Sequence, residues 1–599
     1  MPSRHREAEH ASKVFPHWPF PRRKSPQLSR NPSEEATPKS SGSPPGKNAS
    51  VSEGKDLSGA EQSSDGRRAV LFSGLRTVSL LTFTSRVLGM LRDMWMASLF
   101  GNGPIMDAFS VAFRIPNLAR RLFGEGALST AFLPSFIQEH EQSGAAAAGK
   151  LASGVLTVLA VVLGGLVVVG EILLWLGLRA VAPGSETAML LRLSAIMLPY
   201  LLFICLVAQI SAIMHGLRHF IWPALEAIVL NVIWLACLWW VASWFESKTT
   251  QIQLIAASVV VAGVVQLLAP LPTLRRLGFR FDRDWRAAGP KIKAIALAMF
   301  PVVIGLSIEQ LNTFFDSLIA WGFSRPQTGS EVISWLPGSL EYPLEPGTAS
   351  ALYFGQRVYQ FPLGVFGVAL STVIFPLLSQ HAGQGRMDRL REDFSLGLRL
   401  VFYIGIPASV GLMILATPLT SLLFRHGEFT ADDARQTAQM IWGYGIGVWA
   451  YCGVLILQRG YYAVGDRVTP LRIGFLGIVV DLTMNLTLIW PWGALGLALS
   501  TALSAILQFA LIAWLVQERI GRLDWSSLAQ AAGRAATGSG VMGIVCLGVL
   551  WILPDGTGLA ARCATVLIPL VVALAAYFSM AWWLGMSEIW LLFRRERRG

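Results

Sequence analysis

The chain has 599 residues, of which 53% are hydrophobic and only 14% are charged, whereas a typical soluble domain carries about 25% charged residues. This composition excludes an ordinary soluble enzyme, a disordered protein and a disulfide-stapled scaffold. The apolar segments are continuous runs of about 20 residues, as in membrane-spanning helices, and lack the alternation of β-barrel strands. We therefore expect a polytopic, all-α membrane protein.

The net charge is +12, which in a soluble protein would favour nucleic acid as a partner. In a membrane protein, Lys and Arg gather instead in cytoplasmic loops and tails. No nucleic-acid-binding motif is visible in the chain. We expect membrane lipids around this protein and no nucleic acid partner.

Residues 1–68 differ from the rest of the chain, because they are rich in Ser, Pro, Gly and charged residues. Such a segment cannot bury enough apolar surface to offset the entropy of ordering it. It also lacks the apolar core of a signal peptide. We predict a disordered cytoplasmic tail over 1–68.

About fourteen apolar runs follow the tail, each long enough to span a membrane. They lie at about 70–99, 105–137, 150–178, 187–214, 222–245, 251–272, 292–323, 349–380, 394–423, 437–463, 470–490, 493–517, 532–553 and 559–587. We predict an N-terminal lobe of six spans over 69–285 and a C-terminal lobe of six spans over 286–525. An additional helix pair and a basic tail occupy 526–599.

The charged connections predict the orientation of the spans. Lys and Arg cluster after spans six, eight and twelve and at the C-terminal end, at 275–293, 386–391, 519–534 and 594–598. Connections after odd-numbered spans are poor in both residues. The positive-inside bias therefore places both termini in the cytoplasm.

An internal echo supports a duplicated architecture. The segment 127–134 reads ALSTAFLP and the segment 369–376 reads ALSTVIFP. They end predicted spans two and eight, so their offset is six spans. Two six-helix halves related by an axis along the membrane normal explain this offset; chance similarity between apolar segments is the alternative.

Several arginines lie inside the predicted spans, where each charge costs about 2.5–3.5 kcal/mol on insertion scales. Spans one, two and eight hold Arg86, Arg92, Arg114, Arg120, Arg121 and Arg357. We expect these arginines to face an aqueous cavity shared by the two halves. The alternative is that they only form salt bridges between helices.

A cationic cavity predicts an anionic substrate. Guanidinium holds phosphate through two parallel hydrogen bonds and stays charged when desolvated. Arg86 and Arg92 lie on opposed sides of their helix, so one of them can face the cavity while the other packs or pairs. Asp107 in span two is expected to pair with an arginine or to act in a gate. Arg114 and Glu125, in the same span, are further candidates for gating or orienting roles.

A second polar set lies in spans seven, eleven and twelve. It consists of Asp316, Asp481, Asn485 and Thr501, with Asp481 and Asn485 on one helical face. Their oxygens are hard ligands, which suit a small monovalent cation or a proton relay. A hydrogen-bonded network that braces the second half is the alternative. Zinc is not expected, because no His or Cys joins the set.

The sequence carries no enzyme signature: Walker, GxSxG and HExxH motifs are absent. We therefore expect a transporter and no organic cofactor, driven by an ion gradient, the membrane potential or the substrate gradient. Two alternatives of other classes remain, a membrane-embedded glycosyl or acyl transferase and a non-transporting scaffold. The first lacks a visible base or metal set, and the second has no need of intramembrane arginines.

Four stretches resemble the MurJ (MviN) family of lipid II flippases. They read SRVLGMLRD at 85–93, RIPNLARRLFGEGA at 114–127, RVYQFPLGVFGVAL at 357–370 and LFRHGEFT at 423–430, with Asp107-Ala108-Phe109 before the second. The resemblance covers roughly residues 70–587. The combination of the first two stretches is its most specific part.

This resemblance implies the fold of the multidrug/oligosaccharidyl-lipid/polysaccharide exporters, in which two six-helix lobes enclose a central cavity. Two C-terminal helices form a hydrophobic groove for a lipid tail. The implied substrate is lipid II, the undecaprenyl-pyrophosphate-linked peptidoglycan precursor, moved from the inner to the outer leaflet of the cytoplasmic membrane by alternating access. Cell-wall synthesis proteins are the implied partners. An exporter of another polyprenyl-linked oligosaccharide, or of a drug, is the alternative with the same fold.

The resemblance also implies roles for individual residues. The substrate-binding arginines of the family correspond to Arg86, Arg92, Arg120 and Arg357, and an essential aspartate corresponds to Asp107. A sodium site corresponds to Asp316, Asp481, Asn485 and Thr501. The chain departs from the family in its N-terminal tail, in the long loop at about 324–348, and at Gln356, where many members carry an acidic residue.

Overall fold

The structure is a computed structural model that describes residues 56–122, 129–282, 284, 286–327, 331–333, 339–553, 556 and 558–586. The N-terminal helices and turns are α1 Asp56–Phe100, α2 Pro104–Ala119, α3 Ser129–Ala180, α4 Glu186–Gly216, α5 Ile221–Ala236, η3 Cys237–Val241, η4 Ala242–Trp244, α6 Lys248–Leu268 and α7 Leu271–Arg276. The next set is η5 Arg286–Ala288, α8 Gly289–Gly322, α9 Thr348–Pro362, η6 Leu363–Val368, α10 Ala369–Gly383, α11 Met387–Ile414, α12 Ala416–Leu423, α13 Ala431–Ala463, α14 Val468–Trp492, α15 Ala494–Leu515 and α16 Gln517–Ile520. The last two are α17 Trp525–Ile552 and α18 Leu559–Trp583.

Helices account for all the predicted spans, within the part of the chain that the structure describes. Eleven of these helices are long and apolar enough to cross a membrane. The other predicted spans lie on α1, on α8, and on α2 with the first part of α3. Helix α3 changes direction at Gly144, whose φ of 83° is left-handed, and its two parts carry the end of span two and all of span three.

The first helix extends beyond the expected boundary. We predicted disorder up to residue 68, but α1 begins at Asp56. Residues 56–68 contain no proline, so a helix nucleated in the apolar span can propagate backward one residue at a time at low cost. The remainder of the predicted tail, residues 1–55, lies outside the described residues.

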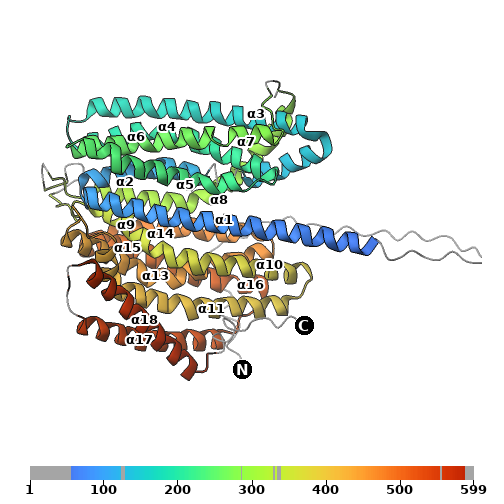
Figure 1. Cartoon of the computed structure of the whole chain (residues 1–599). Coiled ribbons are helices and arrows are strands. Elements are labelled where there is room, and N and C mark those ends of the chain that lie inside the picture. The colour runs from blue at the N-terminus through green and yellow to red at the C-terminus, as the bar shows by residue number, and fades with distance from the viewer. Residues whose placement is uncertain are drawn as a thin grey trace, which may run out of the picture. The chain divides into compact units, whose positions relative to one another are not determined.

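The helices pack in two groups and a pair (Figure 1). In the first group α4 packs against α2, α3 and α6, and α5 packs against α6. In the second group α13 packs against α9, α11 and α15, and α14 packs against α15. Helices α17 and α18 pack on each other and α17 also packs on α11, while α8 contacts α2, α3, α9 and α14. We refer to the two groups as the N-lobe and the C-lobe, and α1, which hydrogen-bonds to α5, is counted with the N-lobe.

Small residues allow the central helices of the C-lobe to approach closely. A Cβ atom at Gly443 would lie 2.7 Å from the Cβ of Ala498, and one at Gly447 would lie 2.9 Å from the Cα of Ala502. Glycines four residues apart on α13 thus face alanines four residues apart on α15. Such small-residue faces drive helix association where no hydrophobic effect operates between helices.

Candidate substrate cavity

Asp93 connects the two lobes. One of its carboxylate oxygens accepts hydrogen bonds from Arg92 at 2.7 Å and from the Tyr353 hydroxyl at 3.0 Å. The other oxygen lies 3.3 Å from Nε of Arg357. Asp93 is only 3% exposed. Because Tyr353 and Arg357 belong to α9, a single buried carboxylate on α1 holds a helix of the opposite lobe.

Arg92 is fixed on the N-lobe side of this carboxylate. Its Nη1 donates to Oδ1 of Asn231 at 3.0 Å, and its guanidinium lies 4.3 Å from the ring centroid of Trp234. The Asn231 amide donates in turn to the Ser85 carbonyl at 3.1 Å. Arg92 is buried. Of the pair Arg86 and Arg92, Arg92 is therefore the member that packs and pairs.

We call Arg92, Asp93, Asn231, Tyr353 and Arg357 the Asp93 network. The sequence analysis noted Arg92 and Arg357 but assigned no site role to the other three. A signal was present for two of them: Asp93 follows Arg92 directly, and Asn231 interrupts an otherwise apolar segment of α5. Tyr353 carries no such signal, because a tyrosine in an apolar helix is ordinary.

A second inter-lobe contact joins Arg114 of α2 to Gln356 of α9. Arg114 Nη2 donates to the side-chain Oε1 of Gln356, and Nε2 of the same side chain donates to the Tyr444 hydroxyl at 3.2 Å. Nε of Arg114 is buried and has no hydrogen-bond partner among the described residues. Arg114 therefore has a neutral partner and retains an unmatched donor.

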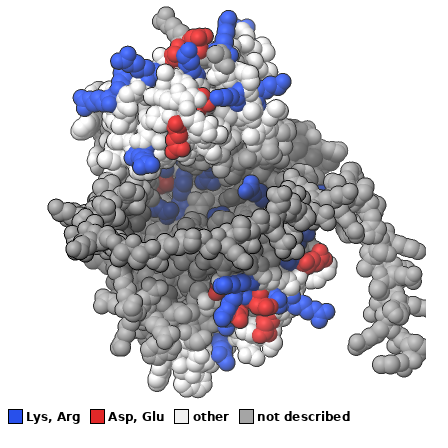
Figure 2. Space-filling model, turned by 90° about the vertical axis from the view of Figure 1, so that its right-hand side faces the viewer, with Lys and Arg blue, Asp and Glu red and all other residues white. Residues whose placement is uncertain are grey.

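The remaining arginines are Arg86 on α1 and Arg120 and Arg121 in the turn that follows α2. Arg120 donates to the side chain of Asn117 at 3.1 Å, within its own turn, and Arg121 donates to Gln310 of α8 at 3.1 Å. Arg86 is exposed and lies against η6: a Cβ atom at Gly364 would be 3.0 Å from Nη1 of Arg86. Figure 2 shows Lys and Arg side chains recessed in a hollow between the upper and lower parts of the molecule. Glu125 lies outside the described residues.

Asp107 caps a helix of the opposite lobe. Its two oxygens accept from the backbone amides of Gly347 at 2.8 Å and Ser350 at 2.6 Å, at the start of α9. Gly347, the N-cap residue, has φ 87° and no side chain to offer, so Asp107 supplies the carboxylate from α2. We expected Asp107 to pair with an arginine or to act in a gate; in the structure it pairs with backbone amides, which a helix N-terminus leaves free for an anion.

The lobes are also joined beside Asp107. Asn102 donates to the Thr437 hydroxyl at 3.0 Å, and the Glu428 amide donates to the Ser98 carbonyl at 2.8 Å. Gly427 has φ 58°, and a Cβ atom there would lie 2.3 Å from the same carbonyl, so only glycine fits. We call the region formed by residues 98–107, 345–350 and 424–437 the closed end.

The predicted polar set of Asp316, Asp481, Asn485 and Thr501, which we call the acidic set, lies on α8, α14 and α15. The Asn485 amide donates to Asp316 at 2.7 Å and to Asp481 at 3.1 Å. All three side chains are buried. The hydroxyl that reaches Asn485 is that of Ser500, whereas the neighbouring Thr501 hydroxyl donates to the Leu497 carbonyl of its own helix at 3.1 Å.

This group contains buried oxygens that lack a hydrogen donor. Oδ1 of Asp481 and Oδ1 of Asn312, which lies one turn before Asp316 on α8, have no hydrogen-bond partner among the described residues. No cluster of three His, Cys, Asp or Glu residues is present in the described part of the chain. The oxygens of Asp481 and Asn312 are therefore acceptors that the described protein groups leave unmatched.

Two groups of apolar helices, joined at one end around a recessed set of arginines, are the architecture of a membrane transporter built from two halves. The family model for lipid II flippase MurJ matches residues 96–591. A probable lipid II flippase MurJ of Vibrio cholerae serotype O1 is 36% identical over 461 residues, 74% of this chain and 82% of that protein. The lipid II flippase MurJ of Burkholderia cenocepacia is 31% identical over 548 residues, 88% of this chain and 100% of that protein.

Solved structures share the same fold. A lipid II flippase MurJ in an inward closed conformation aligns with a TM-score of 0.67 and 22% identity over 84% of this chain and 97% of that one. A multidrug resistance MATE family transporter of the MOP superfamily, in an inward-facing conformation, aligns with a TM-score of 0.57 and 12% identity over 74% and 96%. The chain belongs to the lipid II flippase MurJ family. It is thus a multi-pass membrane transporter and not an enzyme, as the sequence predicted.

Proposed function

We propose that this chain moves lipid II from the inner to the outer leaflet of the cytoplasmic membrane by alternating access. The observation that carries the proposal is the position of Arg114 and Arg357 where the two lobes meet: Arg114 of α2 contacts Gln356 of α9, and Arg357 of α9 contacts Asp93 of α1. Pyrophosphate is the part of lipid II that such guanidinium groups fit best. The named function of the relatives supports the same cargo.

The Asp93 network gives a physical route from binding to movement. Arg357 contacts the Asp93 carboxylate and the Tyr353 hydroxyl, and Arg114 contacts the neutral Gln356 side chain. A pyrophosphate offers Arg114 a stronger acceptor than an amide oxygen, and it competes with the Asp93 carboxylate for Arg357. Its binding weakens the contacts that hold α9 against α1, so the favourable binding free energy offsets the cost of separating the lobes.

The closed end is proposed to face the periplasm. Its opening requires that Asp107 release the amides of Gly347 and Ser350 and that Asn102 release Thr437. The hollow then faces the cytoplasm in this conformation. Both termini are proposed to lie on the cytoplasmic side, as the positive-inside bias indicates.

We also propose that the acidic set couples transport to a monovalent cation or to protons. Asp316, Asp481 and Asn485 would hold the ion, with the Ser500 hydroxyl bound to Asn485 and Thr501 next to it on α15. The unmatched oxygens of Asp481 and Asn312 support this proposal, because a buried acceptor without a donor is costly and a cation or proton satisfies it.

The experiment is depletion of this protein in its host, followed by assay of the leaflet that holds labelled lipid-linked precursors. Lipid II should accumulate on the cytoplasmic side, and wild type should rescue the defect while Arg357→Ala and Arg120→Ala should not. Arg389→Ala is the matched control, since Arg389 forms an exposed ion pair with Glu392 on the surface. A normal lipid II distribution together with a defect in another surface glycan would replace the substrate and keep the fold.

A further inference from the structure

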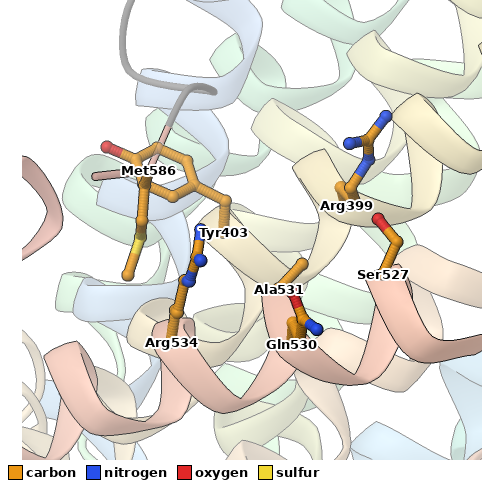
Figure 3. Close-up of a pocket in the computed structure, with 7 residues that line it drawn as sticks. All are labelled: Arg399, Tyr403, Ser527, Gln530, Ala531, Arg534 and Met586. Atoms are coloured by element: carbon orange, nitrogen blue, oxygen red, sulfur yellow. The ribbon is translucent and has the colours of Figure 1, made fainter. Parts of the chain in front are cut away.

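A second cationic pocket lies between α11 and α17, apart from the Asp93 network (Figure 3). Arg399 and Tyr403 border it from α11, and Ser527, Gln530 and Arg534 border it from α17. The residues from α17 lie three, four and seven positions apart, so they share one helical face. The pocket holds about 80 Å³, which is room for a few water molecules or one phosphate-sized group and not for an entire lipid.

The lining of this pocket is cationic and rich in donors. Among the described residues it contains two guanidinium groups, the hydroxyls of Ser527 and Tyr403, one amide and no carboxylate. Nε of Arg399 is buried and has no hydrogen-bond partner among the residues that the structure describes. A buried donor without an acceptor is unfavourable, so an anion beside Arg399 would satisfy a group that the protein leaves unmatched.

Exposed tryptophans place the pocket at the level of lipid headgroups. Trp525 begins α17 and is 46% exposed, while Trp582 and Trp583 end α18 and are 71% and 73% exposed. Helices α17 and α18 pack on each other, and Met586 just beyond α18 also lines the pocket, so these tryptophans lie at the helix ends from which the pocket is built. Tryptophan is enriched where membrane meets water.

We propose that this pocket binds the phosphate of an anionic glycerophospholipid at the end of the helix pair. Arg399, Arg534, Ser527 and Gln530 act as the donors to the phosphate oxygens, and the acyl chains lie along the exposed apolar faces of α17 and α18. A zwitterionic lipid fits less well, because the described lining residues offer two guanidinium groups and no carboxylate for its ammonium group. Basic pockets between membrane helices generally favour anionic headgroups. The proposal is independent of the cargo that the central cavity carries.

The test uses the purified full chain in detergent, titrated with phosphatidylglycerol and with phosphatidylethanolamine, with bound lipid counted by native mass spectrometry. The double variant Arg399→Gln/Arg534→Gln removes both guanidinium groups. The matched control Arg386→Gln/Arg522→Gln removes two exposed arginines from the connections that lead into α11 and α17 but line no part of the pocket. Thermal unfolding of each variant verifies that it is folded.

Wild type and the control should bind phosphatidylglycerol more tightly than phosphatidylethanolamine, and the double variant should lose this binding by about tenfold or more, as expected for two cationic contacts. Equal loss in both variants would reduce the effect to net charge and would overturn the proposal. Displacement of the lipid by inorganic phosphate alone, at concentrations similar to those of the lipid, would assign the pocket to a soluble anion. Preferential capture of lipid II over phosphatidylglycerol at this pocket would likewise overturn it.

Discussion

Asp93 of α1 and Arg357 of α9 form an ion pair across the two lobes, with 3.3 Å between Oδ2 and Nε. The Asp93 side chain is nearly inaccessible, whereas 30% of the Arg357 side chain remains exposed. The carboxylate is thus the fixed partner and the guanidinium is the one that an incoming anion can reach. This asymmetry lets one contact serve both as a structural tie and as part of a binding surface.

The first prediction concerns the tie itself. Asp93→Asn should lower both thermal stability and transport, because it leaves Arg92 and Arg357 without the charge that they share. Breaking a buried ion pair by removing one partner costs about 3–5 kcal/mol, and the partial exposure of Arg357 places this case at the lower end. Thermal unfolding in lipid nanodiscs measures the loss. Asp388→Asn, in an exposed ion pair with Arg391, is the control, and an equal Tm in the two variants would contradict the prediction.

The sequence predicted the helices well and the contacts between them poorly. Apolar run length places a span regardless of its neighbours, which is why α4, α6 and α15 lie where they were expected. Charges that interrupt such runs, as at Arg114, are equally visible. The partner of each charge depends instead on which face of which helix lies opposite, and that is decided by the packing of both lobes.

Asp107 and Gln356 illustrate the limit. A carboxylate among arginines in the sequence favours an ion pair, but Asp107 instead accepts hydrogen bonds from the backbone amides at the start of α9. Gln356 stands where many members of the family carry an acidic residue, yet its neutral side chain still accepts a hydrogen bond from Arg114. In both cases the residue was identified as unusual and its contact was not predictable, because the contact joins segments far apart in the chain.

The second prediction concerns the closed end. Asp107→Ala should favour opening there, since the amides of Gly347 and Ser350 lose their acceptor. A disulfide between Asn102→Cys and Thr437→Cys reports closure, as these side chains are in hydrogen-bonding contact in the closed end. We expect the yield of that disulfide to fall about threefold or more, as for loss of a charge-assisted helix cap of about 1 kcal/mol. The same cysteine pair with Asp388→Ala, an exposed acidic residue at the start of α11, should crosslink as well as the parent. An unchanged disulfide yield with Asp107→Ala would show that the hydrogen bonds of Asp107 to Gly347 and Ser350 do not hold the closed end shut.

The third prediction concerns Gln356. Gln356→Glu places a carboxylate against Arg114 and removes the amide that donates to Tyr444. The new ion pair competes with an anionic cargo, so lipid II binding should weaken by about tenfold while thermal stability stays equal or rises. Gln356→Met, which preserves volume without charge, separates competition from lost packing. Tighter lipid II binding by Gln356→Glu would show that Arg114 does not take part in holding the cargo.

The fourth prediction concerns the acidic set. If Asp481 holds a cation, then sodium should raise the Tm of the wild type relative to potassium, because a ligand that binds only the folded state stabilises it by about 2.7 kcal/mol at a hundredfold excess over its Kd. Asp481→Asn should abolish that rise, whereas Asp466→Asn, in the connection between α13 and α14, should retain it. If the coupling ion is a proton, no sodium effect is expected, and lipid II movement in vesicles should instead respond to an imposed pH gradient in the wild type but not in Asp481→Asn. An Asp481→Asn variant that keeps both the sodium effect on Tm and the response to the pH gradient would show that the acidic set only braces α8 against α14.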